Sequence, residues 1–221
     1  MAKKEPTVNR RGLMLVVSSP SGAGKTSLSR ALVAQENTTK HARIVFSISA
    51  TTRKKRGQEK DGVDYHFLTQ EQFDSLCRQK KFLEHALVFG HHYGTPREPV
   101  MQALTAEQDV LFDIDWQGAQ QLRTLTHDVV SIFILPPSLS ELRRRLSTRQ
   151  TDTPQQMNRR LQQAEDDIQQ WHNYDYVLIN QDFDTTVRHM RTILHSERLK
   201  RHRQTHLQDT IAHLLAASQD S

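Results

Sequence analysis

Apolar positions fall in short runs separated by polar loops, and this pattern indicates strands buried on both faces. Such runs occupy residues 13–18, 44–48, 110–114, 129–135 and 176–179. Each run contains four to seven residues, which is shorter than most helices, and polar segments bound it on both sides. The pattern therefore predicts five strands in the interior of a sheet.

Segments with helical periodicity lie between these runs. We expect helices over residues 27–36, 69–82, 138–149 and 153–171, and a last long helix with an apolar stripe at Val187, Met190, Ile193 and Leu194. Three of them open with Ser or Thr followed three residues later by Glu or Gln, the spacing of a capping box, at Thr69, Ser138 and Thr153. Strands that alternate with helices predict an α/β fold in which helices flank a mostly parallel sheet.

The stretch from residue 49 to residue 99 interrupts this alternation, because it is long, charged and rich in loops. Ligands of parallel sheets bind at the carboxyl ends of the strands. We therefore expect this stretch to form a subdomain over that edge of the sheet.

A phosphate-binding loop is the strongest chemical signal in the sequence. It follows the first strand, precedes the first helix, and consists of Ser19, Pro20, Ser21, Gly22, Ala23, Gly24, Lys25 and Thr26. Small residues let backbone N–H groups surround a phosphate, and the helix N-terminus adds partial positive charge. In such a loop Lys25 reaches the β- and γ-phosphates and the Thr26 hydroxyl can bind Mg²⁺. A plain turn between strand and helix is the alternative, which the Gly-Lys-Thr sequence in this register disfavours.

Two carboxylates at the end of a later strand strengthen the interpretation. Asp113 and Asp115 follow the apolar residues 110–112, and alternation along a strand points both side chains to the same side. Beside a phosphate loop, a carboxylate at this place lies near the metal or its water ligands. Many strands also end in an Asp that caps a helix, and the sequence leaves open which of the two lies nearer the metal.

Composition and charge narrow the choice of partners. The 221 residues include 30 Lys and Arg against 25 Asp and Glu, a net charge of +5 that suits an enzyme of phosphorylated substrates, a nucleic-acid binder or a membrane-surface protein. The single cysteine, Cys77, excludes an intrachain disulfide and a cysteine-based zinc site. No apolar run approaches the roughly 20 residues of a membrane span, and the polar N-terminus does not resemble a secretory signal. We expect a cytoplasmic protein with no membrane partner, monomeric or homo-oligomeric.

Five further segments resemble guanylate kinases, a family of nucleoside monophosphate kinases with the P-loop NTPase fold. They are residues 49–56 (SATTRKKR), 62–67 (GVDYHF), 82–95 (FLEHALVFGHHYGT), 113–119 (DIDWQGA) and 133–138 (FILPPS). The resemblance runs in order from about residue 13 to about residue 198. It implies an N-terminal extension (1–11) and one domain (12–221). Within that domain it implies a core (about 12–48, 98–147 and 154–221), a GMP-binding subdomain (about 49–97) and a short lid (about 148–153).

The resemblance also implies an activity, the Mg²⁺-dependent transfer of the γ-phosphoryl group of ATP to GMP, and a role for each matching residue. The implied GMP-binding residues are Ser49, Arg53, Arg56, Tyr65, Glu84, Tyr93, Gly94, Thr95 and Asp115. ATP would be bound by the phosphate loop and by Asn180 near the adenine. The implied catalytic residues are Lys25, Arg53, Arg145, Arg149 and Arg160, and the metal would be held by Thr26 and Asp113.

The residue chemistry is consistent with these roles. Arginine binds a phosphate through two parallel hydrogen bonds. Guanine presents two adjacent donors, N1–H and the 2-amino group, and one carboxylate such as Glu84 can accept both. Adenine lacks these donors and would leave the carboxylate unpaired, which can reject the wrong base by about 10⁴-fold.

Three alternatives remain at this level. A kinase that phosphorylates a sugar phosphate would need no guanine-binding carboxylate. A guanylate-kinase-like protein-binding module would have lost the phosphate-loop chemistry, whereas Gly24, Lys25 and Thr26 are present here. A P-loop protein that binds nucleic acid is suggested only by the net charge, and residues 53–56 taken alone would fit a solvated basic turn. We expect ATP and GMP as substrates and no nucleic-acid partner.

Overall fold

The main sheet of the computed structural model is parallel and has five strands, as the apolar runs predict. The structure describes residues 10–38, 43–126, 128–147 and 154–217. The strand order in the main sheet is β2-β7-β1-β8-β9. The strands are β1 (Met14–Ser18), β2 (Ile44–Phe46), β7 (Asp109–Asp113), β8 (Val129–Leu135) and β9 (Tyr176–Ile179). In the pairing of β1 with β7, Val17 lies opposite Asp113.

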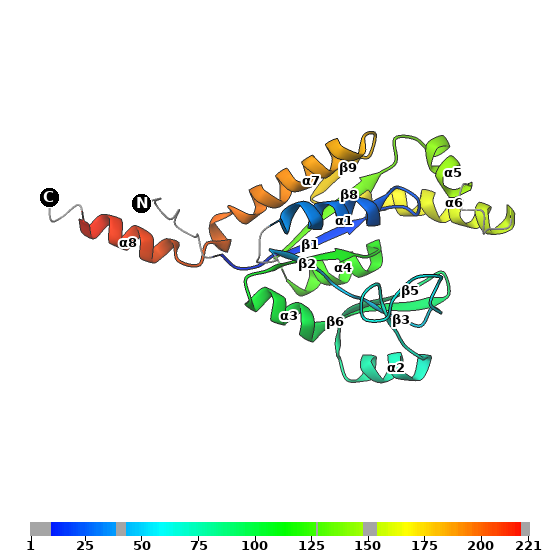
Figure 1. The fold of residues 1–221 in the computed structure, drawn as a ribbon, viewed down its shortest axis with the longest axis horizontal. Coiled ribbons are helices and arrows are strands. Elements are labelled where there is room, and N and C mark those ends of the chain that lie inside the picture. The colour runs from blue at the N-terminus through cyan, green and yellow to red at the C-terminus, as the bar shows by residue number, and fades with distance from the viewer. Residues whose placement is uncertain (1–9, 39–42, 127, 148–153, 218–221) are drawn as a thin grey trace.

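A second, smaller sheet lies within the stretch that interrupts the alternation. Its strand order is β4-β3-β6-β5, and the strands are β3 (Ala50–Thr51), β4 (His66–Phe67), β5 (Phe82–Val88) and β6 (His91–Pro96). Helix α2 (Gln70–Arg78) packs against it through Phe73, which stacks on Phe82. Figure 1 shows this sheet and α2 set apart from the main sheet, with β5 nearest the core.

Helices cover both faces of the main sheet, because side chains alternate along its strands. Leu15 and Val17 pack toward α1 (Lys25–Glu36) and α7 (Phe183–Arg198) on one face. Val16 and Phe112 pack with Leu122 of α4 (Trp116–Leu125) and Val100 of α3 (Arg97–Thr105) on the other face. The remaining helices are α5 (Leu139–Ser147), α6 (Pro154–Ile168), α8 (Leu207–Ala217) and two 3₁₀ turns, Gln169–Asn173 and Arg201–Arg203.

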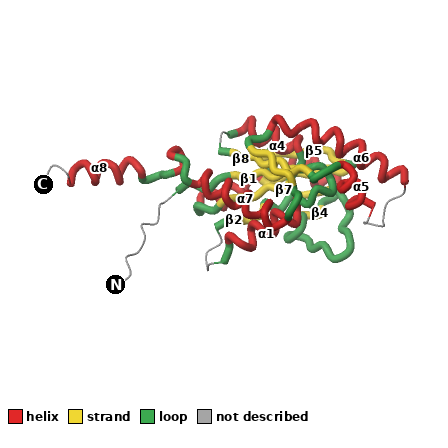
Figure 2. Tube along the Cα trace, turned by 90° about the horizontal axis from the view of Figure 1, so that it is seen from above, coloured by secondary structure: helices red, strands yellow, loops and turns green. Residues whose placement is uncertain are grey.

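Helix α8 extends away from the body of the molecule, as Figure 2 shows, with Ile211, Leu214 and Leu215 exposed. Within the part of the chain that the structure describes, no helix is both long enough and apolar enough to cross a membrane.

The sequence places most elements well, and its errors lie at their ends. The capping box of Thr69 and Gln72 is formed, but the helix expected to run to residue 82 stops at Arg78. Lys80 adopts a left-handed φ of 55°, which ends the helix, and Phe82 opens β5 instead.

The end of α5 expected at residue 149 lies outside the described residues; the structure describes this helix from Leu139 to Ser147, and its N-terminus is capped where Ser138 Oγ accepts the backbone N–H of Glu141. One other helix ends earlier than expected. Helix α6 gives way to a 3₁₀ turn after Ile168, and the predicted cap at Thr153 lies outside the described residues.

Ion pairs buried at the amino end of β7 connect Arg10, at the start of the described chain, and Arg198, at the end of α7, to the sheet. Asp109 is fully buried, and its carboxylate accepts hydrogen bonds of 2.8 Å from Arg10 and 2.8 Å from Arg198. The backbone N–H of Leu13 donates to it as well, at 3.0 Å. Arg198 in turn pairs with Glu36 at the end of α1. The many donors compensate the burial of this carboxylate, and its removal takes away the carboxylate partner of Arg10 and one of the two carboxylate partners of Arg198.

We predict that Asp109→Asn lowers the free energy of unfolding by about 3 kcal/mol, because Arg10 and Arg198 lose their shared anion while the side-chain shape is kept. Urea denaturation of the full chain measures the change. Asp184→Asn is the matched control, since Asp184 is exposed in the first turn of α7. A decrease in the free energy of unfolding no larger than that of the control would contradict the proposed contribution of these ion pairs to stability.

Candidate active site

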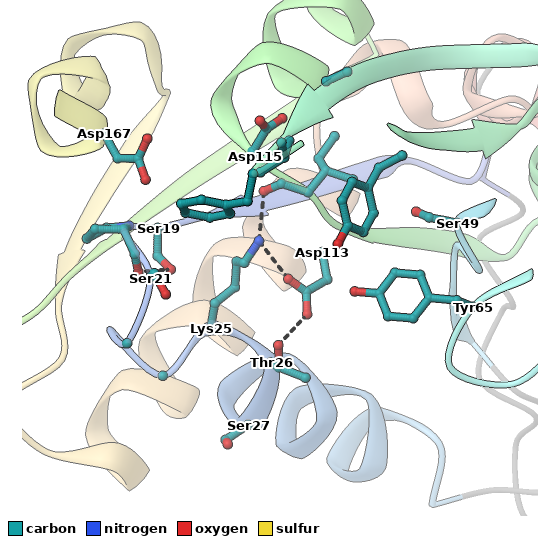
Figure 3. Close-up of a pocket in the computed structure, with 18 of the residues that line it drawn as sticks. Ser19, Ser21, Lys25, Thr26, Ser27, Ser49, Tyr65, Asp113, Asp115 and Asp167 are labelled. Atoms are coloured by element: carbon teal, nitrogen blue, oxygen red, sulfur yellow. Dashed lines mark hydrogen bonds and ion pairs between the residues drawn. The ribbon is translucent and has the colours of Figure 1, made fainter. Parts of the chain in front are cut away.

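A cavity of about 330 Å³ opens at the carboxyl ends of β1 and β7 and faces the small sheet. Its wall combines three parts of the chain that are distant in sequence. The predicted site residues that line it are Ser19, Pro20, Ser21, Gly22, Gly24, Lys25, Thr26, Ser49, Tyr65, Glu84, Tyr93, Asp113 and Asp115. Figure 3 shows Lys25 and Thr26 pointing at Asp113, with Tyr65 and Ser49 on the side of the small sheet.

The phosphate loop owes its shape to two glycines. Gly22 and Gly24 have φ values of 91° and 99°, a left-handed conformation that costs little only without a Cβ. A Cβ on Gly24 would also lie 2.9 Å from Nδ2 of Asn180. That amide, which is buried, donates to the carbonyl of Ala23 at 2.9 Å. Asn180 therefore holds the loop from behind.

Lys25, Thr26 and Asp113 form a compact charged cluster at the start of α1. The ammonium Nζ of Lys25 lies 2.7 Å from Oδ1 of Asp113 and donates to the carbonyl of Ile114 at 2.8 Å. The Thr26 hydroxyl donates to Oδ2 of Asp113 at 2.7 Å. Asp115 instead caps α4, where its Oδ1 accepts the N–H of Gly118 at 3.0 Å. Of the two carboxylates, Asp113 is the one beside Thr26.

Glu84 lies on the opposite wall, on β5, and its side chain is 4% exposed. The Thr95 hydroxyl, directly across the strand pair, donates to Oε1 of Glu84 at 2.6 Å. Burial raises the pKa of Glu84 to about 7, the nearby Asp115 carboxylate acts in the same direction, and the hydrogen bond from Thr95 opposes both. Ser49 Oγ lies 3.5 Å from the Thr95 hydroxyl.

Arg53 lies behind the cavity wall, 6% exposed, and is held in place by a residue that the sequence did not single out. Its Nη2 and Nη1 donate to the two carboxylate oxygens of Glu59 at 2.8 and 3.0 Å, and its Nε donates to the hydroxyl of Tyr93 at 3.3 Å. The guanidinium also lies 5.3 Å from the ring centroid of Tyr65. Arg56 is exposed on the same loop, where its backbone N–H donates to Glu59.

The remaining predicted residues are distributed as follows. Arg145 of α5 bonds Glu141 at 2.7 Å and reaches the Ala23 carbonyl at 3.4 Å, so it contacts the phosphate loop. Gly94 is buried in β6, where a Cβ would lie 3.1 Å from the ring of Phe82. Arg160 is half-buried on α6 and does not line this cavity, within the described part of the chain. Arg149 and the predicted lid at 148–153 lie outside the described residues.

Sequence patterns missed two residues that shape the cavity. Asp167 of α6 lines it, and burial raises the pKa of this carboxyl above its usual range. Gly118 is the third residue of α4, and a Cβ there would lie 2.5 Å from Oε2 of Glu84. A contact between residues 34 positions apart leaves no local signal, and Asp167 lies in an acidic helical run that is typical of a solvated face.

Comparisons with known proteins point to one family. The family model described as "Guanylate kinase" matches residues 11–197. A guanylate kinase of Paramagnetospirillum magneticum is 50% identical over 95% of this chain and 96% of its own, and one of Jannaschia sp. is 48% identical over 96% of each chain. The crystal structure of guanylate kinase from Anaplasma phagocytophilum is 36% identical, with a TM-score of 0.76, over 91% of this chain and 94% of that chain.

We predict that Glu84→Gln stabilises the chain at pH 8 but not at pH 4.5. The pKa of Glu84 is about 7 in the folded chain, against an ordinary 4.5. The folded state therefore loses stability as the pH rises from 4.5 through 7, because ionising the buried carboxyl is unfavourable. The full difference corresponds to about 3 kcal/mol. Urea denaturation at the two pH values measures it, with the exposed Glu165→Gln as control. Equal stability of the Glu84→Gln variant and the original chain at pH 8 would contradict the raised pKa.

Proposed function

The chain belongs to the guanylate kinase family, so it transfers the γ-phosphoryl group of ATP to GMP, and we propose that the cavity described above is where it does so. The observation that carries this proposal is that Lys25 and Thr26 share one cavity with the buried carboxyl of Glu84. A phosphate-binding group and a base-binding group in one cavity are what a transfer between two nucleotides requires.

On the donor side, the phosphate loop would bind the phosphates of ATP through its backbone N–H groups and Lys25. Asn180 would lie near the adenine, in keeping with its place behind the loop. Arg145 reaches the loop from α5 and would neutralise charge that develops during transfer. We retain Arg149 and Arg160 as candidates for the same role.

On the acceptor side, ionised Glu84 would accept N1–H and the 2-amino group of guanine, with Thr95 holding its other oxygen and Asp115 nearby. Arg53, Arg56 and the phenols of Tyr65 and Tyr93 would hold the phosphate of GMP. Burial raises the pKa of Tyr65 to about 12, so its hydroxyl stays protonated and can donate. Ser49 and Gly94 complete the site: Ser49 lies beside Thr95, and Gly94 lets β6 pack closely on Phe82.

Guanylate kinases, as nucleotide kinases, use Mg²⁺ with ATP, and we propose that Thr26 and Asp113 hold the ion. A hydroxyl and a carboxylate oxygen 2.7 Å apart are the hard donors that Mg²⁺ prefers. Among the described residues no cluster of three or more metal-binding side chains occurs. This fits Mg²⁺, which usually takes one or two protein carboxylates and completes its shell with phosphate oxygens and water. When bound, the ion neutralises phosphate charge.

The reaction requires little acid–base catalysis from the protein. The attacking atom is an oxygen of the GMP phosphate, already ionised at neutral pH, so no strong general base is needed. The residues above would work by positioning two anions and offsetting their charge. Lys25 is held by Asp113 in this structure and would turn its ammonium to the phosphates when ATP arrives.

The wider assignments remain proposals. We propose a GMP-binding subdomain over about 49–97, a lid over about 148–153 and an N-terminal extension over 1–11. We also propose a cytoplasmic location with no membrane or nucleic-acid partner, as a monomer or a homo-oligomer.

We predict that ADP release from ATP and Mg²⁺ requires GMP and is not supported by AMP, CMP, UMP or a sugar phosphate. A coupled ADP assay across these acceptors measures it. Lys25→Met should lower the rate by at least about 10²-fold without changing the circular dichroism spectrum, because it removes a cation from the transferring group.

Each alternative has its own outcome in this assay. Release with a sugar phosphate alone would favour the other kinase and overturn the role of Glu84. A folded sample that released no ADP with any acceptor would favour the protein-binding module. Binding to nucleic acid that weakens steeply with salt would support the third alternative.

We predict that Gly118→Ala raises the KM for GMP by about tenfold or more and leaves the KM for ATP within about twofold. A Cβ at this position would displace Oε2 of Glu84, although alanine itself favours the helix. Steady-state kinetics with each substrate varied in turn measures both constants. Ala119→Gly is the matched control, because it removes a Cβ at the next position of α4. An unchanged KM for GMP would mean that the close approach of α4 does not set the position of Glu84.

A further inference from the structure

The hairpin that joins β5 to β6 turns at an unusual residue. Val88 pairs with His91, so the turn consists of Phe89 and Gly90, whose φ values are 49° and 79°. A two-residue turn with both φ values positive favours Asn, Asp or Gly at its first position. Phe89 has a bulky side chain in this left-handed conformation, which costs about 1–2 kcal/mol.

The same residue also exposes a large apolar surface. Phe89 is 59% exposed, so strain and exposure coincide on one side chain. Two other described non-glycine residues have positive φ, Lys80 and Glu107, and their polar side chains are exposed at little cost. A local conflict of this kind, when it lies at a functional site, suggests a role in function.

Phe89 lines the active-site cavity. It shares that cavity with Pro20 and Lys25 of the donor side and with Glu84 of the acceptor side. Leu87, two residues earlier, is 56% exposed. It is not among the described residues that line the cavity, because side chains alternate along β5 and Leu87 points to the other face. The hairpin therefore presents Phe89, together with Ala86 and Val88, to the cavity and exposes Leu87 on its other face.

We propose that Phe89 seals the transfer site: with both nucleotides bound, its ring packs over them and keeps water away from the γ-phosphoryl group. Two acceptors compete once ATP is bound. Transfer breaks the bond between the γ-phosphorus and the β,γ-bridging oxygen and forms one to an oxygen of the GMP phosphate, giving ADP and GDP. Attack by water breaks the same bond and gives ADP, inorganic phosphate and a proton. An apolar cover favours the first outcome by excluding the second acceptor.

The inference rests on the proposed function. The decisive measurement is the ratio of inorganic phosphate to GDP, which reports how often water replaces GMP as the acceptor. ADP, GDP and inorganic phosphate are quantified in one reaction of the full chain with ATP, Mg²⁺ and GMP. For Phe89→Asn we expect inorganic phosphate per GDP to rise at least about threefold and kcat/KM for GMP to fall about tenfold, the loss expected when an aromatic contact is removed. Its melting temperature should stay equal or rise, since Asn suits the turn.

Two further variants separate sealing from damage to the hairpin. Phe89→Tyr keeps the ring and should keep the partition of the original chain, and Leu87→Asn changes an equally exposed residue and should also keep it. A Phe89→Asn variant that partitions like the original chain would overturn the inference, as would equal uncoupling by Leu87→Asn. If the original chain formed no GDP at all, the proposed function would fail first, and this result is visible before any variant is made.

Discussion

The parallel pairing of β1 with β7 is the interaction on which the donor side depends. Backbone hydrogen bonds fix Val17 opposite Asp113, so the phosphate loop that follows β1 emerges beside the carboxylate that ends β7. Both strands are buried among apolar side chains from the two faces, which prevents a shift of register. The contacts of Lys25 and Thr26 with Asp113 follow from this pairing.

Helix α4 couples the acceptor side to the same sheet. It begins one residue after Asp115, at the end of β7, and runs along β5 of the small sheet. The side-chain amide of Gln121 forms two hydrogen bonds with the backbone of His85, at 3.1 and 2.8 Å. Gly118, one turn earlier, leaves room for the carboxyl of Glu84. The distance between the two proposed substrate sites would thus be set largely by α4, which contacts both parts of the structure.

Local patterns in the sequence were sufficient to predict the secondary structure around the phosphate loop. An apolar run, small residues and Gly-Lys-Thr predict a strand, a turn and a helix start, and all of these depend on neighbours in the chain. The acceptor-side residues that we propose were suggested only by a family resemblance, because Glu84 becomes distinctive when folding buries it. Gly118 lies in the family-like segment 113–119 but received no role from it, and Glu59 and Asp109 gave no signal, since the importance of all three comes from contacts with distant residues. The end of α2 was misjudged because the backbone turn at Lys80 has no glycine to mark it.

The residues that stabilise the fold and the residues proposed to bind substrate lie at opposite ends of β7. Asp109 opens β7 and is saturated by Arg10, Arg198 and a backbone N–H, an arrangement that favours a fixed structure. Asp113 is the last residue of the same strand, four positions later, and its partners, Lys25 and Thr26, are the groups that nucleotide phosphates and Mg²⁺ would engage. The buried acid Glu84 and the strained Phe89 lie around this second end. The strained and buried residues that lower stability therefore lie where bound substrates would compensate the cost. In the free chain, the ion pairs of Asp109 at the other end of β7 offset it.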